Sequence, residues 1–155
     1  MSKKLNIGLF GFGVVGQGLY DIVKTKHLNI EIVKFAIKDP NKKRSLPAHL
    51  FTTDKEELLN NPEINTIVEL INDTEAAFEI VSRALKSGKN VVSASKKMIA
   101  LHLDELIEIQ HQYGTSLFLI FDREKKGSRC WCDGRLNGCG HWKIRLRHAS
   151  NLTTV

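Results

Sequence analysis

Short apolar runs and longer amphipathic stretches take turns along this chain. The apolar runs are rich in Val, Ile and Leu, which is typical of strands buried on both faces of a parallel sheet. They cover residues 5–10, 30–37, 65–71, 90–93 and 116–121. Apolar residues at helical spacing predict helices between these runs, over residues 14–26, 53–60, 74–86 and 101–112. This alternation predicts an α/β fold with a doubly wound, mostly parallel sheet.

Capping signals mark where several of these helices begin and end. Asp73 stands at the N-cap position of the helix over residues 74–86, and Gly88 follows its last turn. Thr53 and Glu56 have the spacing of a capping box, so a short helix is expected to start there. The side chains expected to be buried on the two longer helices that follow are Ala77, Ile80, Val81, Ala84, Leu85, Leu103, Leu106 and Ile107.

Three glycines follow the first predicted strand at once. Gly11, Gly13 and Gly16 have the spacing G-x-G-x-x-G, and a predicted helix starts between the second and the third. In this strand–turn–helix context the pattern is typical of Rossmann-type dinucleotide-binding domains. The first glycine allows a tight turn, the second lets a pyrophosphate approach the backbone, and the third lets the helix pack on the strand. The N–H groups at the helix start then point at the anion.

Three strand ends are expected to meet at one crevice. In a doubly wound sheet, ligands bind beyond the carboxyl ends of the strands, where the strand order reverses beside the first strand. The segments that follow the strands there are residues 11–16, 69–74 and 93–97. They supply the glycine turn, a helix start and two adjacent lysines, so this edge of the sheet is the predicted site.

The residues at these strand ends resemble one family in detail. After the glycine motif come Val68-Glu69-Leu70-Ile71 and, further on, Val91-Val92-Ser93-Ala94-Ser95-Lys96. After Lys97, an apolar pair and an alanine follow. Over residues 4–116 the chain is similar to the NAD(P)-binding domain of homoserine dehydrogenase. The two later motifs are far more discriminating than the glycines alone.

The resemblance implies an NAD(P)-dependent oxidoreductase that interconverts L-homoserine and aspartate 4-semialdehyde, a step of threonine and methionine biosynthesis. It places Lys96 at the junction of cofactor and substrate, where an ammonium can hold a substrate oxygen or carboxylate for hydride transfer. Without the resemblance, Lys96 and Lys97 are an ordinary pair of solvated lysines. The cofactor-binding residues expected in this way are Gly11, Phe12, Gly13, Val14, Val15, Gly16, Lys38, Asp73, Thr74, Ser93, Ala94 and Lys96.

Two places depart from the family pattern. Ser95 stands where the family has Asn, and Asn72-Asp73 stand where many members have two glycines. Side chains at the latter place narrow the crevice, and Asp73 adds a negative charge near the nicotinamide unless it serves as a helix cap, which we favour. Glu69 is expected to be a structural residue at the end of its strand and not a catalytic acid.

The end of the second predicted strand bears on the choice between NAD and NADP. A terminal Asp or Glu binds the ribose 2′-hydroxyl of NAD, whereas a basic residue accepts the 2′-phosphate of NADP. Lys38 precedes Asp39 here, and Lys42, Lys43 and Arg44 follow. The cluster favours NADP slightly over NAD. A lysine-rich loop that is only solvated is the alternative.

Charge and composition change abruptly near residue 117. Residues 1–116 hold 15 Lys and Arg against 14 Asp and Glu, whereas residues 117–155 hold 8 against 3. All three Cys and both Trp lie in the second part. The net charge of +6 therefore says little about the predicted domain. We expect one Rossmann domain over residues 1–121 and a poorly ordered tail over residues 122–155. The tail is unrelated to the family, so we expect that its codons are translated in another reading frame or that it was added artificially.

The tail raises two further hypotheses. Cys130, Cys132, Cys139 and His141 are soft metal ligands, but the C-x-C spacing is tighter than structural zinc sites prefer, so no metal is predicted. The arginines and tryptophans of the tail raise the hypothesis of a nucleic-acid-binding arm. Charge without a recognisable fold is weak evidence, so no nucleic-acid partner is predicted. A disulfide is not expected in a reducing cytoplasm.

The remaining expectations concern location, activity and assembly. No apolar run approaches the roughly 20 residues of a membrane span, and the N-terminus has no signal-peptide pattern, so a cytoplasmic protein without membrane contact is expected. No second domain with the family's further catalytic residues is recognised, so the chain is expected to bind NAD(P) but to be inactive alone. The resemblance also implies a homodimer. The alternative function is a stand-alone nucleotide sensor that catalyses nothing.

Overall fold

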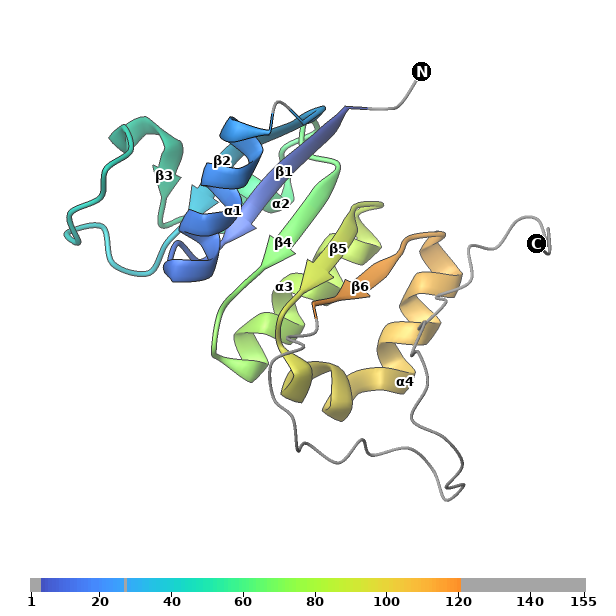
Figure 1. The fold of residues 1–155 in the computed structure, drawn as a ribbon. Helices are drawn as coiled ribbons and strands as arrows, with labels where there is room; N and C mark the ends of the chain where they lie inside the picture. Colours follow the sequence, from blue (N-terminus) through green and yellow to red (C-terminus); the bar gives the residue numbers. More distant parts are fainter. Residues whose placement is uncertain (1–3, 27, 121–155) are drawn as a thin grey trace, which may run out of the picture.

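A computed structural model describes residues 4–26 and 28–120. Its strands form one sheet in the order β3-β2-β1-β4-β5-β6, and every pairing in the described part is parallel (Figure 1). The strands are β1 (Leu5–Phe10), β2 (Ile30–Ala36), β3 (Phe51–Thr52), β4 (Thr66–Glu69), β5 (Asn90–Ser93) and β6 (Leu117–Leu119). The helices are α1 (Val14–Thr25), the 3-10 helix η1 (Ala48–Leu50), α2 (Glu56–Leu59), α3 (Thr74–Lys86) and α4 (Lys96–Tyr113). The strand order reverses beside β1, which confirms the predicted doubly wound α/β fold.

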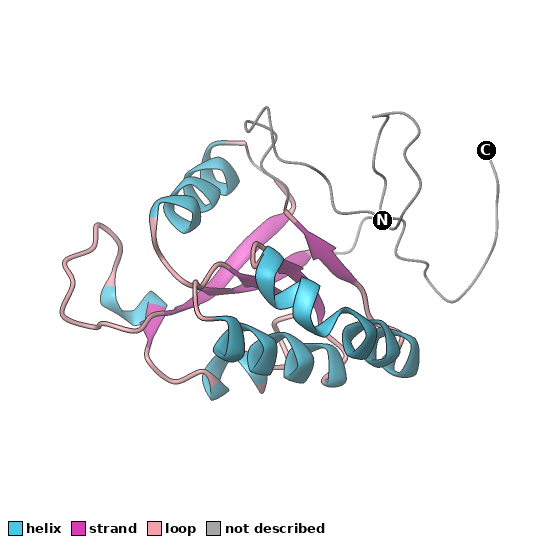
Figure 2. Ribbon diagram, turned by 90° about the horizontal axis from the view of Figure 1, so that it is seen from below, coloured by secondary structure: helices cyan, strands magenta, loops and turns pink. Residues whose placement is uncertain are grey.

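Helices cover both faces of the sheet (Figure 2). On one face, buried side chains of β4 and β5 such as Ile67 and Val91 pack with Leu85 of α3 and Leu106 of α4. On the other face, α1 covers a smaller core around Leu9 of β1. Because both faces are covered, the strands are apolar along their length, as the sequence predicts for a parallel sheet.

The end of the sheet's fourth strand and the start of the last helix differ from the sequence prediction. β4 ends at Glu69 and not at residue 71, because the N–H of Ile71 donates to the Glu69 side chain (Oε1, 2.7 Å) and leaves the ladder. The helix α4 begins at Lys96 and not at residue 101. Two lysines in its first turn carry no apolar periodicity, so the sequence pattern misses that turn.

A kink in α4 overturns one predicted core position. His102 has non-helical backbone angles (φ −122°, ψ 22°), and its ring stacks on Phe78 of α3 with centroids 3.8 Å apart. The kink changes the direction in which the next residues point. Leu103 is therefore 47% exposed, and the prediction that it is buried was wrong. Ile107 is only partly buried, whereas Leu106 is fully buried as expected.

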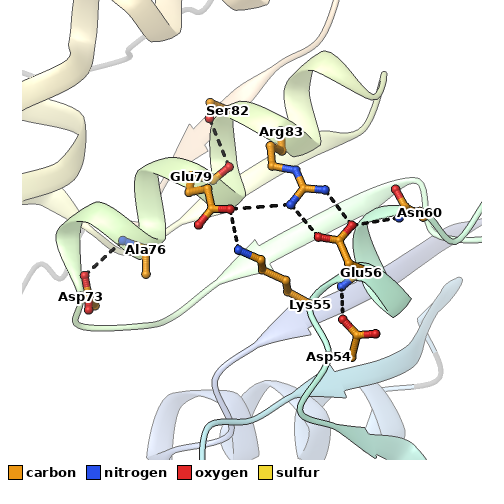
Figure 3. A network of polar contacts seen from close by, with 9 residues as sticks. All are labelled: Asp54, Lys55, Glu56, Asn60, Asp73, Ala76, Glu79, Ser82 and Arg83. Carbon is orange, nitrogen blue, oxygen red and sulfur yellow. Dashed lines mark hydrogen bonds and ion pairs between the residues drawn. The ribbon is translucent and has the colours of Figure 1, made fainter.

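Helix α2 begins without the predicted capping box. The side chain of Asp54 accepts the N–H of Glu56 (2.8 Å), and the helix starts at Glu56, two residues later than the motif requires. The carboxylate of Glu56 does not return to the helix start. It accepts two hydrogen bonds from Arg83 of α3, both 2.7 Å long, while Lys55 donates to Glu79 (2.5 Å) (Figure 3). These pairs clamp α2 onto α3.

The remaining differences lie at the two edges of the sheet. The sequence pattern misses β3 and η1, because a two-residue strand has no periodicity to detect. At the opposite edge, the expected strand over residues 116–121 is shorter at both ends. Phe121 and the rest of the tail, with Cys130, Cys132, Cys139 and His141, lie outside the described residues. Within residues 4–26 and 28–120, no helix is long and apolar enough to cross a bilayer.

Candidate functional site

The glycine turn after β1 is tightly packed at its first and third glycines. Gly11 has φ +96°, and a Cβ there would lie 2.9 Å from the carbonyl oxygen of Leu70. A Cβ at Gly16 would lie 2.6 Å from the carbonyl oxygen of Gly11. Both contacts are too close for any larger residue, so this turn brings the start of α1 directly against the end of β1.

The second glycine of the motif faces open space. Gly13 is the N-cap of α1 in an extended conformation, and a Cβ there would meet no atom within 4 Å. The first N–H groups of a helix have no partner inside the helix, and the helix dipole favours an anion beside them. A phosphate group therefore fits the space beside Gly13, in contact with backbone.

A crevice of about 270 Å³ lies beside this turn. It is bounded by the start of α1, the loop from β4 to α3 and the loop from β5 to α4. The residues that line it are Val15, Leu70, Ile71, Asn72, Thr74, Ala94, Ser95, Lys96 and Lys97. Apolar side chains form one part of the lining and two ammonium groups another, which is the mixed chemistry of a site for a ring-bearing ligand with an anionic neighbour.

The crevice has a positive side. Lys96 and Lys97 form the first turn of α4, and that turn holds no acidic residue. The sequence places these lysines in a loop, so their position at the N-terminus of a helix is a correction. Two ammonium groups and the positive end of a helix dipole together favour a carboxylate or phosphate in the crevice.

Asp73 does not carry its negative charge into the crevice. Its Oδ1 accepts the N–H of Ala76 (3.1 Å), so it caps α3 as the sequence predicts (Figure 3). The side chain that does line the crevice at this departure from the family pattern is the neutral Asn72.

Glu69 lies beneath the crevice and is fully buried. Its Oε1 accepts the N–H of Ile71 (2.7 Å), and its Oε2 accepts the hydroxyl of Ser93 (2.5 Å). The hydroxyl oxygen of Ser93 in turn accepts the N–H of Ser95 (3.0 Å). Burial raises the pKa of the Glu69 carboxyl group, while the two hydrogen bonds oppose this shift.

A second cavity, of about 440 Å³, lies beyond the ends of β2 and β3. Lys42 and Arg44 line it together with Phe51. The guanidinium of Arg44 donates to the carbonyl oxygens of Lys42 (2.8 Å) and Asp39 (2.7 Å) and lies 5.2 Å from the centre of the Phe51 ring. Arg44 is thus held in one place by the backbone around the cavity.

The comparison with known families decides what this arrangement belongs to. A family model described as homoserine dehydrogenase, NAD binding domain, matches residues 11–119. The chain belongs to the homoserine dehydrogenase family. The match reaches residue 119, at the end of β6, so the family resemblance extends beyond residue 116, where the sequence analysis ends it.

Curated homoserine dehydrogenases align with most of this chain but only with part of their own length. The enzyme of Pseudomonas aeruginosa is 33% identical over 120 residues, which is 72% of this chain and 28% of the relative. The enzyme of Bacillus subtilis is 30% identical over 126 residues, 75% of this chain and 29% of the relative. The chain thus spans less than a third of the length of these relatives.

Solved structures of the family have the same fold. The homoserine dehydrogenase of S. aureus at pH 7.0 superposes with a TM-score of 0.68 at 33% identity, over 77% of this chain and 33% of that structure. The homoserine dehydrogenase from Thiobacillus denitrificans superposes with a TM-score of 0.67 at 31% identity, over 76% of this chain and 29% of that structure. The described domain is a Rossmann-type dinucleotide-binding domain.

The structure divides the cofactor-binding residues expected from the sequence into two groups. Around the crevice and the glycine turn lie Gly11, Gly13, Val14, Val15, Gly16, Thr74, Ala94 and Lys96. The side chains of the other expected residues do not face the crevice. The Phe12 ring packs edge-on against Phe35 and Phe51, with centroids 4.8 and 5.1 Å apart, the Ser93 hydroxyl faces Glu69, and Lys38 is exposed outside both cavities.

Several lining residues were not named among the expected cofactor-binding residues. They are Leu70, Ile71, Asn72, Ser95 and Lys97, and all five lie in the strand-end segments 69–74 and 93–97 that the sequence places at the crevice. Arg44 and Lys42 belong to the basic cluster recognised after the second strand. No sequence signal shows which of its cations face the cavity, because that depends on how the irregular loop folds over Phe51.

Proposed function

We propose that this chain holds NADP, and less tightly NAD, in a reaction that oxidises L-homoserine to aspartate 4-semialdehyde. One observation carries the proposal: the open backbone at Gly13 and the crevice with Lys96 and Lys97 lie side by side at the carboxyl edge of the sheet. An extended dinucleotide needs this pair of subsites, one for its pyrophosphate and one for its nicotinamide.

The residues of the crevice have distinct tasks in this proposal. The nicotinamide, when bound, accepts or supplies the hydride. Val15, Leu70 and Ile71 offer apolar surface to its ring and exclude water. The ammonium groups of Lys96 and Lys97 hold the carboxylate or hydroxyl oxygen of an amino acid, which restricts the substrate to one orientation. L-Homoserine offers both oxygens.

The cavity beyond β2 supports the preference for NADP. Arg44 and Lys42 line it, and Lys38 stands exposed at the end of β2. These three cations favour a 2′-phosphate over a neutral 2′-hydroxyl, because phosphate forms charge-assisted hydrogen bonds with them. No carboxylate lines this cavity in the described part of the chain to bind a ribose hydroxyl.

Calorimetric titration of the 155-residue chain with NADPH, NADH and ADP tests the proposal. We expect binding of both dinucleotides, tighter for NADPH, and weaker binding of ADP, which lacks the nicotinamide end. No binding of either dinucleotide would refute the assignment. On the family relationship alone we further propose a homodimer, a cytoplasmic location and a role in threonine and methionine biosynthesis.

A further inference from the structure

The proposed reaction does not explain why Glu69 is buried. It is a carboxylate with no exposed surface, at the last position of a strand that is buried along its whole length. Taking a carboxylate out of water is costly unless hydrogen bonds replace those of water. An apolar residue would serve a sheet core better, so the carboxylate at this position calls for another reason.

The partners of the carboxylate give that reason. One oxygen accepts the N–H of Ile71, in the loop from β4 to α3. The other accepts the hydroxyl of Ser93, whose oxygen accepts the N–H of Ser95, in the loop from β5 to α4. Ile71 and Ser95 both line the crevice, on the walls that follow neighbouring strands. A single side chain thus fixes both of these walls from below.

The link to Ser95 also sets the start of α4. Ser95 is the N-cap of that helix, and Lys96 is its first residue. The carbonyl oxygen of Glu69 accepts the N–H of Ala94 (3.0 Å), which adds a backbone bond between the end of β4 and the loop from β5 to α4. Glu69 and Ser93 therefore link the Ile71 backbone to the residue that directly precedes Lys96.

We propose that Glu69 is a positioning residue for the nicotinamide end of the site, acting through Ser93 on Ser95 and Lys96. The inference rests on the proposed function, since it concerns the geometry of the proposed nicotinamide crevice. Glu69 touches no ligand itself, because it has no exposed surface. Burial raises the pKa of its carboxyl group, and the hydrogen bonds from Ser93 and Ile71 oppose that rise, as expected for a side chain that uses both oxygens as acceptors.

Two ligands separate positioning from general disruption of the fold. NADPH occupies both ends of the proposed site, whereas 2′-phospho-ADP-ribose lacks the nicotinamide and reports only on the other end. For Glu69→Ala we expect the affinity for NADPH to fall about five- to ten-fold, the worth of about one hydrogen bond. The affinity for 2′-phospho-ADP-ribose should stay within about two-fold of wild type. The emission of bound NADPH should also shift, because its nicotinamide is held differently.

Three further variants make the test independent of how well Glu69→Ala folds. Ser93→Ala removes the middle of the chain of hydrogen bonds and should act in the same direction, whereas Ser93→Thr keeps the hydroxyl and should bind NADPH like wild type. Thr66→Val is the matched control, since Thr66 is a buried polar residue at the other end of β4 whose hydroxyl bonds to Asn65. It should change neither affinity.

Two outcomes would overturn the inference. Equal losses for both ligands would show that Glu69 and Ser93 only support the fold, and unchanged NADPH binding in Glu69→Ala and Ser93→Ala would show that they position nothing. Failure of wild type to bind either ligand is a different result, because it would overturn the proposed function itself.

Discussion

A Cβ atom at Gly16 would lie 2.6 Å from the carbonyl oxygen of Gly11, closer than such contacts are found in proteins. The two residues belong to one motif, yet the contact distinguishes them from its middle member. A Cβ at Gly13 would meet no atom within 4 Å. Gly11 and Gly16 therefore serve the fold, whereas the space at Gly13 is left for a ligand.

Gly16→Ala should destabilise the protein. The added methyl group cannot be accommodated unless α1 moves away from the end of β1, and such overpacking costs about 1–3 kcal/mol. Urea unfolding followed by circular dichroism measures this as a lower midpoint with an unchanged slope. Gly18→Ala is the matched control, because it lies on the same helix with no atom within 4 Å of the new Cβ. A midpoint for Gly16→Ala equal to that of this control would contradict the packing argument.

Gly13→Val should leave the fold intact and abolish dinucleotide binding. Gly13 has φ −93°, which valine adopts without strain, and the loss of a glycine N-cap costs no more than about 1 kcal/mol. The branched side chain would fill the space proposed for the pyrophosphate. Calorimetry with NADH and NADPH, beside urea unfolding of the same variant, measures both effects. Equal binding by wild type and a folded Gly13→Val would rule out the pyrophosphate site.

Lys38→Glu should weaken NADPH binding more than NADH binding, by about ten-fold, if this lysine meets the 2′-phosphate. Lys42→Glu provides the comparison, since Lys42 lines the cavity beyond β2 and Lys38 does not. Lys86→Glu, an exposed change at the end of α3, controls for net charge. A differential effect in Lys42→Glu alone would move the phosphate contact from Lys38 into the cavity.

The sequence is a good guide to the fold here because the regular elements have strong local signals. The helix α3 has the predicted bounds, its cap at Asp73 forms as expected, and α1 starts where the glycine motif places it. Sequence signals fail where hydrogen bonds or ring contacts with other elements set the local structure. The start of α4 depends on Ser95 being held by Ser93, and the kink at His102 depends on stacking against Phe78. The stacking of His102 joins two helices, and the contact of Ser95 with Ser93 is local but depends on Glu69 of another strand, which holds the Ser93 hydroxyl.

The candidate site is predictable only in outline, for a similar reason. The three strand ends indicate where the crevice lies, but not which side chains turn into it. Ser93 is turned inward because Glu69 is buried beneath it, and Asp73 is turned aside because it caps α3. The direction of each polar side chain is set by its hydrogen-bond partner. For Asp73 that partner is three residues away and the sequence predicts it, whereas for Ser93 it lies on another strand.

The free energy of unfolding should fall at acid pH, because the carboxylates that pair α2 with α3 become protonated. Hydrogen bonds from Arg83 lower the pKa of Glu56, and hydrogen bonds from Lys55 lower the pKa of Glu79. A lowered pKa in the folded state gives stability that is present above the ordinary value of 4.5 and is lost as the pH falls below it through the lowered pKa. Glu69 acts in the opposite sense, because its raised pKa favours folding below that value.

The variant Glu56→Gln tests the predicted loss of stability at acid pH. It should make the decline in unfolding midpoint below pH 4.5 shallower than in wild type, since one of the linked groups no longer titrates. Glu75→Gln, on the first turn of α3 and outside the clamp, controls for the loss of a carboxylate. Thermal unfolding between pH 3 and pH 7 in low salt measures it. Parallel pH profiles for wild type and Glu56→Gln would show that the clamp contributes no pH dependence.

The 155-residue chain by itself should bind NAD(P) yet oxidise L-homoserine very slowly. Hydride transfer from an alcohol needs a group that takes the hydroxyl proton, and the only ionisable side chains that line the crevice in the described part of the chain are Lys96 and Lys97. A lysine ammonium group has three N–H donors and no acceptor, so it does not take up the hydroxyl proton. Lack of a suitable acid–base partner costs at least about 100-fold in rate.

The assay follows NAD(P)H formation with excess L-homoserine at alkaline pH, with the enzyme of Bacillus subtilis as positive control. Lys96→Met should remove what turnover remains, because the ammonium that holds the substrate is lost while the length of the side chain is kept. Turnover by the wild-type chain within ten-fold of the control, at equal NAD(P)H affinity, would be decisive against this account. It would mean that residues outside the described part, or a second chain, supply the missing proton acceptor, and it would exclude the alternative of a nucleotide sensor that catalyses nothing.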